Sequence, residues 1–327
     1  MTLSTDQLGA MDTAGAMLLY QLLSQLESAG GRIDRSNLNS RQRALLELVA
    51  QRRVDSHTPS KPRENWLAQI GRASVGSIRE GISYLNFLGE LTIRLVPQIL
   101  CPWQIRWREV INEIALAGVQ ALFIVGLLSF LIGMVLAYQG GATLEQYGAN
   151  ILIVDMVAIV TLREMAPLIT AILVAGRTGS SYAAQIGTMK ITEEVDALRA
   201  IGIHPLDMLV VPKVIALIIV MPLLFIYADV LGLLGGAMVA SAVFDVSMQT
   251  YFNRVPEVVS LSTLLVGLMK APVFAVVIAI IGCHQGMRVT GSAAAVGAAT
   301  TMSVVQAIFT VIILDALFSV LFNMMGI

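Results

Sequence analysis

The sequence predicts an all-α membrane protein, and three observations lead to this prediction. Hydrophobic residues make up 56% of the 327 residues and charged residues only 13%, whereas about 25% of the residues in a soluble domain are charged. Five apolar segments each exceed the ~20 residues that a helix needs to cross a bilayer. The charges are also uneven, because 13 of the 21 Lys and Arg residues lie in residues 1–109. A mildly basic segment beside a membrane is typical of a cytoplasmic position.

Residues 1–54 are expected to form a small cytoplasmic segment with two helices. The motif DTAG at residues 12–15 precedes an apolar run at residues 17–26, and a second helix is predicted at about residues 40–52. This pattern resembles part of a STAS domain, although the strands that would precede the motif are largely missing from the sequence. The segment is therefore predicted to be a partial α/β unit. A polar linker with two prolines follows at residues 55–63.

Residues 64–100 are predicted to form a helix that lies in the membrane interface. Apolar residues recur at helical spacing from Trp66 to Leu91, and Arg72, Arg79 and Arg94 are interspersed along the same helix. These charges argue against a membrane span, and an amphipathic helix with basic residues is typical of an interfacial position. The alternative is that this helix packs on the later spans in the ordinary way.

Five membrane-spanning helices are predicted in the remainder of the chain. Their expected bounds are residues 110–138, 151–174, 209–241, 258–283 and 293–324. The third span contains Pro212 and Pro222, so a tilt or a kink is expected there. Small residues such as Gly232, Gly235 and Gly236 are frequent, and they permit close contacts between helices.

Residues 175–205 are polar and charged, although an apolar span lies on each side of them. Thr192 is expected to cap a helix at about residues 192–203, because the two acidic residues that follow it would occupy the first turn, where the helix dipole favours negative charge. Gly202 is expected to end this helix. The side chains expected to mediate docking are Glu193, Glu194, Asp196, Leu198 and Arg199. A short amphipathic helix on one membrane face suits the docking of a partner, and the alternative is a solvated helix in a loop.

The distribution of basic residues predicts the orientation of the spans. The residues assigned to one side of the membrane are Arg106, Arg108, Arg177, Lys190, Arg199, Lys213 and Arg288. The loops expected on the other side, residues 139–150 and 245–257, carry only Arg254. The N-terminus and the polar stretch are therefore expected in the cytoplasm, and the C-terminus is expected on the outer face.

The sequence contains no motif that indicates catalysis by this chain. The Walker A pattern, the GxSxG elbow and the HExxH metal motif are all absent. The three histidines are dispersed, and Cys101 and Cys283 lack the spacing of a metal site. We therefore expect a non-catalytic subunit with no cofactor or metal of its own and no nucleic-acid partner.

The candidate functional residues are ionisable groups inside apolar spans. Arg163, Glu164 and Lys270 are the clearest of these. Weaker candidates of the same kind are Asp155, Asp229 and Asp315. A charge in mid-bilayer costs several kcal/mol unless it faces a cavity or a partner. Two alternatives follow: Glu164 and Lys270 form an internal salt bridge that fixes helix packing, or they line a polar spot that holds an anionic headgroup.

Four motifs give this chain a resemblance to a known family. They are Leu162-Arg163-Glu164, AGRTGS at residues 175–180, EEVDAL at residues 193–198 and MKAPVF around Lys270. With these motifs, about residues 64–327 resemble the MlaE (YrbE) permeases. The resemblance implies an interfacial helix, five transmembrane helices and a cytoplasmic coupling helix, a layout that hydropathy and capping also predict.

The resemblance also implies a function and partners. Members of the family are membrane subunits of ABC transporters that work with MCE-domain proteins and move phospholipid or related lipids. The implied setting is the inner membrane of a Gram-negative bacterium, with the C-terminus in the periplasm, where the system maintains the lipid asymmetry of the outer membrane. The implied assembly is a permease homodimer with a lipid cavity, an ATPase dimer that binds ATP and docks on the coupling helix, and a periplasmic MCE protein.

Two other functions are compatible with the pattern of residues. An ion-coupled secondary transporter of a hydrophobic or amphipathic substrate would use Glu164 and Lys270 as its coupling pair and need no ATPase. A STAS-regulated membrane scaffold would have no use for the buried charges. The charged helix at residues 192–203 favours the ABC transporter, because a secondary transporter needs no such docking site.

Overall fold

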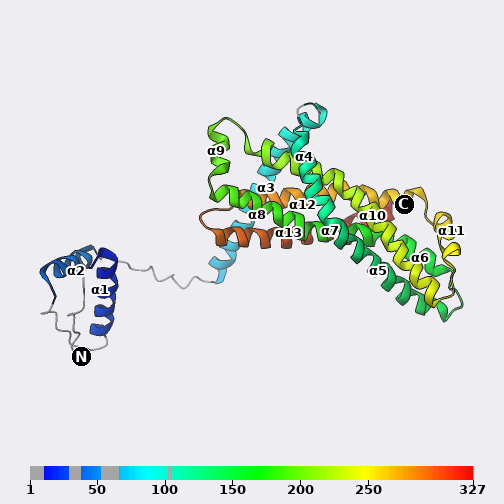
Figure 1. Cartoon of the computed structure of the whole chain (residues 1–327), viewed down its shortest axis with the longest axis horizontal. Coiled ribbons are helices and arrows are strands. Elements are labelled where there is room, and N and C mark those ends of the chain that lie inside the picture. Colours follow the sequence, from blue (N-terminus) through cyan, green and yellow to red (C-terminus); the bar gives the residue numbers. More distant parts are fainter. Residues whose placement is uncertain (1–10, 29–37, 53–65, 102, 104, 327) are drawn as a thin grey trace. The chain divides into compact units, whose positions relative to one another are not determined.

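The computed structural model describes residues 11–28, 38–52, 66–101, 103 and 105–326 of the chain (Figure 1). Throughout these residues every regular element is a helix and no strand occurs, so the predicted all-α class is confirmed. The chain divides into two compact units, Met1–Ser77 and Ile78–Ile327. Five helices of the second unit are long and apolar enough to cross a membrane, which makes the chain a multi-pass membrane protein.

The first unit contains the two predicted helices, α1 (Thr13–Ser28) and α2 (Ser40–Arg52). Asp12 caps the first of them, because its Oδ1 accepts a hydrogen bond from the Gly15 amide at 2.7 Å. The strands of a STAS domain would precede this cap, in residues 1–10, which lie outside the described residues. The predicted linker lies outside them too, so the STAS resemblance stays a prediction.

Helix α3 (Trp66–Leu100) occupies the place of the predicted interfacial helix. Within its described part, Leu91 is fully buried against the bundle, whereas Leu85 and Ile93 on other faces are largely exposed. The helix therefore packs on the spans along one side and keeps apolar side chains on another. Packing on the later spans, the second alternative from the sequence, is therefore seen at Leu91, and the position in the membrane interface stays a prediction.

The first three spans are longer than their predicted apolar cores, the fourth begins and ends a few residues later than predicted, and the fifth has the predicted bounds. The first comprises α4 (Trp107–Ile114), the π-helical turn η2 (Ala115–Val119) and α5 (Gln120–Glu145). The second comprises α6 (Leu152–Val160), η3 (Thr161–Met165), α7 (Ala166–Val174), η4 (Ala175–Gly179) and α8 (Ser180–Ile191). The third comprises η5 (Leu206–Val210) and α10 (Val211–Val243), the fourth is α12 (Leu261–Met287) and the fifth is α13 (Ala293–Met324). The short helices α9 (Glu194–Ala200) and α11 (Met248–Val258) lie in the connections before and after the third span.

The second span differs most from its prediction. It was expected to end at residue 174, but the helix continues through the polar stretch to Ile191. Helix α8 packs against α12 and α13 and buries Tyr182, Ala183 and Ile186. The stretch is rich in small residues, which read as a loop by hydropathy but allow backbones to approach closely. Only residues 192–205 remain as the connection to the third span.

Helix α10 is the most buried span and packs extensively on α5 and α12 (Figure 1). Its contact with α5 depends on glycine, because a Cβ at Gly235 would lie 2.0 Å from the Phe130 carbonyl oxygen. Pro212 lies in the first turn of α10, where its missing N–H costs nothing. The helix continues through Pro222 to Val243.

A substitution at this contact tests the packing. We expect Gly235→Ala to destabilise the fold by about 1–3 kcal/mol, because the new methyl group forces α5 away from α10. The control is Gly297→Ala in α13, where a Cβ meets nothing within 4 Å. The measurement is the thermal unfolding temperature of the purified full chain. A drop of the same size in both variants would contradict the close contact.

Candidate functional site

The centre of the candidate site is the ammonium group of Lys270 in α12. This side chain is completely buried. Its Nζ donates to Glu164 Oε2 at 2.8 Å, to Asp315 Oδ1 at 2.8 Å and to the Arg163 carbonyl oxygen at 3.1 Å. An ammonium group has three protons, so all three are matched by acceptors. We call Glu164, Lys270 and Asp315 the charge cluster.

The acceptors come from two other spans. Glu164 and the Arg163 carbonyl belong to the π-helical turn η3, and such turns often mark functional sites in helices. Asp315 lies on α13 with Ser319 one turn further on, and the Ser319 hydroxyl donates to Glu164 Oε2 at 2.9 Å. The charge cluster thus joins the second, fourth and fifth spans.

Glu164 and Lys270 form the salt bridge that was one of the two alternatives left open by the sequence, and the structure adds a second carboxylate. Asp315 was only a weak candidate in the sequence, and Ser319 was not considered. The signal for both was present, because residues four apart on a helix share one face. Two polar side chains at that spacing in an apolar span indicate a common partner.

Access to the charge cluster differs among its members. The Lys270 side chain is 0% exposed, whereas Glu164 keeps 28% of its surface and the neighbouring Arg163 keeps 25%. The Arg163 Nε lies 4.0 Å from Glu164 Oε1. A ligand would therefore meet Arg163 and Glu164, and Lys270 would act on it only through the two carboxylates.

A second buried ammonium group lies in the third span. Lys213, in the first turn of α10, pairs with Glu113 of α4 and donates to Gln185 Oε1 of α8 at 2.7 Å. Its Nζ also lies 4.5 Å from the centre of the Tyr182 ring, which is within the range of a cation–π contact. Lys213 was counted among the basic residues between the second and third spans, but it is buried within the bundle, and its side of the membrane stays a prediction.

The predicted coupling helix exists as α9, but it begins differently. Thr192 does not cap it, because its hydroxyl donates to the Thr188 carbonyl at 3.1 Å and contacts Glu194 Oε1 at 2.9 Å. The residue before the helix is Glu193, in the left-handed conformation with φ of 63°. Helix α8 ends at Ile191 with Thr192 as its C-cap residue, so the chain turns at Thr192 and Glu193 before α9 begins.

The end of α9 is as predicted. Gly202 has φ of 82°, and its amide donates to the Arg199 carbonyl while the Ile203 amide donates to the Leu198 carbonyl, at 3.0 and 2.9 Å. These two bonds form a Schellman cap, which favours glycine at this position. Among the coupling candidates, Glu193, Glu194, Asp196 and Arg199 are exposed and Leu198 is half-buried.

Both ends of the α9 segment are attached to long helices by charged side chains. Asp196 accepts from Lys190 of α8 at 3.4 Å and from Arg199 at 3.1 Å. Beyond α9, Asp207 pairs with Arg94 of α3 at 2.7 Å. His204 Nε2 lies 3.1 Å from Glu90 Oε1, also on α3.

A further ion pair lies at the opposite end of the second span. Arg254 of α11 donates to Asp155 of α6 through Nε and Nη2, both at 2.9 Å. It also donates to Glu257 at 3.2 Å. The hydrogen bonds to Asp155 and Glu257 hold the pKa of the Arg254 guanidinium above its ordinary value. Among the residues that the structure describes, no group of three or more His, Cys, Asp or Glu side chains is placed to hold a metal ion.

Comparison with known proteins identifies the family. The model of the family described as Permease MlaE matches residues 110–321, and the chain belongs to this family. A probable ABC transporter permease protein of Rickettsia bellii is 34% identical over 255 residues, which cover 74% of this chain and 98% of the relative. A probable ABC transporter permease protein of Synechocystis sp. is 35% identical, over 64% of this chain and 80% of the relative.

A plant relative is also similar over most of the chain. It is the chloroplastic protein TRIGALACTOSYLDIACYLGLYCEROL 1 of Arabidopsis thaliana, which is 28% identical over 88% of this chain and 80% of its own length. The family model, which covers residues 110–321, includes all three spans that carry the charge cluster. The site therefore lies within the part of the chain that defines the family.

Stepwise neutralisation tests the charge cluster. We expect Lys270→Met to destabilise the protein by about 3–5 kcal/mol, because it leaves two carboxylates without their buried partner. Adding Glu164→Gln restores part of this loss, and adding Asp315→Asn restores most of it, since no unpaired charge then remains. The measurement is the unfolding temperature of each purified variant. Equal stability of the single and triple variants would show that Glu164 and Asp315 do not compensate the charge of Lys270.

Proposed function

We propose that this chain is the membrane subunit of an ABC transporter that moves phospholipid, or a related lipid, between the inner membrane of a Gram-negative bacterium and a periplasmic MCE-domain system. Its role in the cell would be to maintain the lipid asymmetry of the outer membrane. Membership of the MlaE permease family and relatives named as ABC transporter permeases support the class of transporter. The name of the plant relative, which refers to a diacyl glycolipid, supports a lipid substrate.

The observation that carries the proposal for this chain is the charge cluster beside a partly exposed Arg163. Intramembrane charges are costly and mark substrate pathways more often than inert packing. Arg163 is suited to hold a lipid phosphate, because a guanidinium group matches phosphate geometry. Glu164 and Asp315 hold Lys270 in place, so their pairing sets the position of η3 next to the headgroup.

Energy for transport would come from a separate subunit. The chain lacks a P-loop, so ATP would bind to an ATPase dimer, and this chain would be a non-catalytic permease that pairs as a homodimer. The docking element would be α9 with the residues that flank it, because Glu193, Glu194, Asp196 and Arg199 are exposed there and the apolar Ile201, which follows the helix, is 70% exposed. An exposed apolar residue among charges is typical of a contact with a partner.

The second span would transmit motion from the ATPase-docking site on α9 to the lipid site. This helix is continuous from Leu152 to Ile191, and Lys190 at its end pairs with Asp196 of α9. Glu164 lies 26 residues before Lys190, which is about 39 Å along a helix axis. A displacement of α9 would thus reach the charge cluster through one element. The pairs from Asp207 and His204 would pass the same motion to α3.

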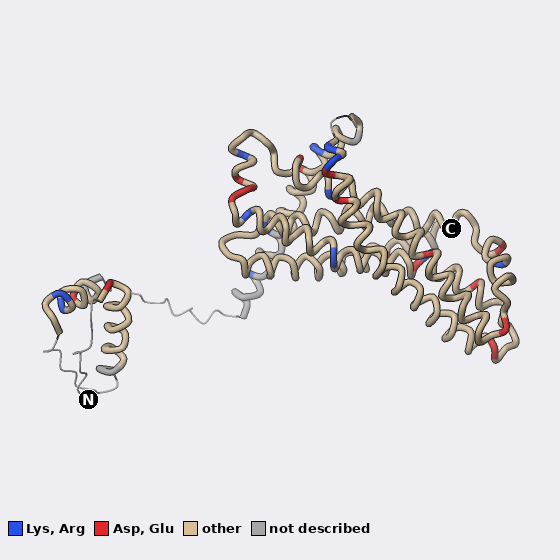
Figure 2. The backbone as a smooth tube through the Cα atoms, in the orientation of Figure 1, with Lys and Arg blue, Asp and Glu red and all other residues tan. Residues whose placement is uncertain are grey.

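The proposed orientation places α9 in the cytoplasm and α11 in the periplasm, beside the MCE protein. In Figure 2 the blue backbone positions of Lys and Arg in the second unit lie mainly toward α4 and α9, whereas mostly red positions of Asp and Glu lie around α11. This distribution agrees with the excess of basic residues that cytoplasmic loops carry.

An ion-coupled transporter is the second candidate, and one observation favours it. Two carboxylates share one ammonium group, and such a group is able to exchange a proton during transport. Lipid transfer by the full chain in liposomes separates the two candidates, because only the ABC transporter requires the ATPase and ATP.

Docking on α9 is tested with Ile201→Lys. We expect association with the ATPase to weaken by about tenfold, because a buried apolar contact becomes a charge. The unfolding temperature should not change, since Ile201 is exposed. The matched control is Met248→Lys in α11, also an exposed apolar residue. The measurement is the ATPase retained on the purified permease, and equal retention in both variants would refute docking on α9.

Orientation is tested by cysteine labelling in spheroplasts, in a background without Cys101. A cysteine in place of Tyr147, in the turn between the first two spans, should react with an impermeant thiol reagent. One in place of Ile201 should react only after lysis. Both native side chains are highly exposed, so accessibility within the fold does not limit either reaction. The opposite pattern would reverse the proposed orientation.

A further inference from the structure

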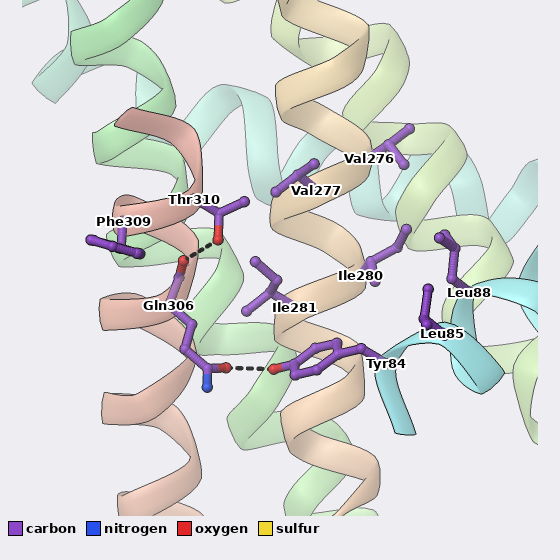
Figure 3. Close-up of a pocket in the computed structure, with 10 residues that line it drawn as sticks. All are labelled: Tyr84, Leu85, Leu88, Val276, Val277, Ile280, Ile281, Gln306, Phe309 and Thr310. Atoms are coloured by element: carbon purple, nitrogen blue, oxygen red, sulfur yellow. Dashed lines mark hydrogen bonds between the residues drawn. The ribbon is translucent and has the colours of Figure 1, made fainter. Parts of the chain in front are cut away.

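A cavity of about 600 Å³ lies between α3, α12 and α13, away from the charge cluster (Figure 3). Its walls are apolar side chains from all three helices. The residues that form these walls are Leu85, Leu88, Val276, Val277, Ile280, Ile281 and Phe309. Leu85 and Phe309 are exposed toward the surroundings, so the cavity opens sideways between membrane helices.

One end of this cavity is a layer of hydrogen-bonded polar side chains. The Tyr84 hydroxyl donates to Gln306 Oε1, and Figure 3 shows the two side chains reaching toward each other across the cavity. The amide of Gln285 donates to the Tyr84 oxygen at 2.9 Å and to Gln306 Oε1 at 2.6 Å. Gln285 is a buried residue of α12. The layer thus joins the three helices and provides polar atoms beside apolar walls.

A second cavity, of about 300 Å³, begins on the other side of this layer. Gln285 lines it, together with Arg288, the residue that follows α12, and Met302 of α13. Met302 lies one turn from Gln306, and Arg288 lies one turn from Gln285, so the two cavities follow each other along the same pair of helices. Arg288 is exposed and brings a positive charge to this end.

The position of the second cavity shows which end of the two cavities lies nearer to α9. Val289, which also lines it, lies near α8, because a Cβ at Gly187 would be 2.9 Å from Val289. The last turn of α8 leads directly into α9. The end with Arg288 is therefore the end that carries the proposed ATPase dock.

We propose that the two cavities together form a binding groove for one phospholipid of the cytoplasmic leaflet. The acyl chain lies between α3, α12 and α13. The ester region lies at the layer of Tyr84, Gln285 and Gln306. The phosphate faces Arg288. The order apolar, polar, cationic along the groove matches the order of groups along a phospholipid.

The length of the groove agrees with this occupant. Its lining residues on α13 extend from Ala295 to Thr310, and 15 residues of helix measure about 22 Å. One leaflet with its headgroups is half of the ~40–45 Å of a bilayer. The groove thus spans the depth of one leaflet, whereas docking of a second copy of the chain would require no gradient from apolar to cationic.

This site is separate from the charge cluster, and only its placement in the cytoplasmic leaflet rests on the proposed function, through the orientation of α9. None of Arg163, Glu164, Lys270 and Asp315 lines either cavity. Occupancy is therefore measured without ATP, so a failure of this inference is distinct from a failure of the proposed function.

The experiment is photolabelling of the full chain in nanodiscs. The probe is phosphatidylglycerol with a diazirine in one acyl chain, and labelled peptides are mapped by mass spectrometry. We expect label in residues 276–281 and 306–310. Val277→Trp fills the cavity and should reduce this label by about tenfold. Val273→Trp, one turn away on the same helix and outside the lining, should leave it unchanged.

A second variant tests the headgroup contact without altering the core. Arg288→Gln should reduce labelling by the phosphatidylglycerol probe by about tenfold, because a charge-assisted contact to phosphate is lost. Labelling by a diacylglycerol with the same diazirine chain should not change. Equal loss with both probes, or none with either, would overturn the placement of the phosphate.

Two outcomes would overturn the groove itself. One is label that Val277→Trp does not reduce. The other is the absence of label together with efficient disulfide formation between two copies carrying Phe309→Cys, which would show that a second copy of the chain covers this face. Unfolding temperatures of all variants separate these results from misfolding.

Discussion

The packing of the membrane-spanning helices depends on one constraint, the burial of the Lys270 ammonium group in an apolar helix. Such a charge is stable in a bilayer only when acceptors surround it. Glu164, Asp315 and the Arg163 carbonyl provide them, and they come from the second and fifth spans. Meeting this requirement fixes how three helices are rotated relative to one another. It also gives a reason for the π-helical turn, which presents a carbonyl and a carboxylate to the same ammonium group.

Polar contacts tie the second span to its neighbours at two other levels. Near one end, Asp155 of this span binds Arg254. Near the other, Gln185 accepts from Lys213, a second buried ammonium group, which is also paired with Glu113. The second span therefore has a polar partner in the third, fourth and fifth spans and in α11, and its Arg177 donates to Gln120 of the first span. Apolar packing alone leaves the register of membrane helices weakly determined, because lipid tails compete equally well for apolar surface.

Much of this architecture can be predicted from the sequence, and the predictions that were wrong failed for a physical reason. Hydropathy finds the five spans because the bilayer imposes a minimum apolar length. Capping chemistry finds the end of α9 at Gly202, and the cost of isolated charges predicts the pair of Glu164 with Lys270. The second span is misjudged beyond residue 174, because small polar residues that pack between helices resemble a loop. Asp315 and Lys213 are misjudged because the partner of a buried charge depends on which helix faces fall together, which no single segment encodes.

The three polar contacts bear on how the proposed motion would travel. A helix tied to its neighbours at one point can tilt about that point. The second span is tied at Asp155, Glu164 and Gln185, which extend over about 45 Å of helix, so a tilt about one contact would break another. Two of these contacts end at buried ammonium groups, Lys270 and Lys213, so breaking either one would cost at least about 1 kcal/mol. The low-energy response to a displacement of α9 is therefore movement of the span together with the side chains bound to it. The proposed dock and the charge cluster would then move as parts of one body.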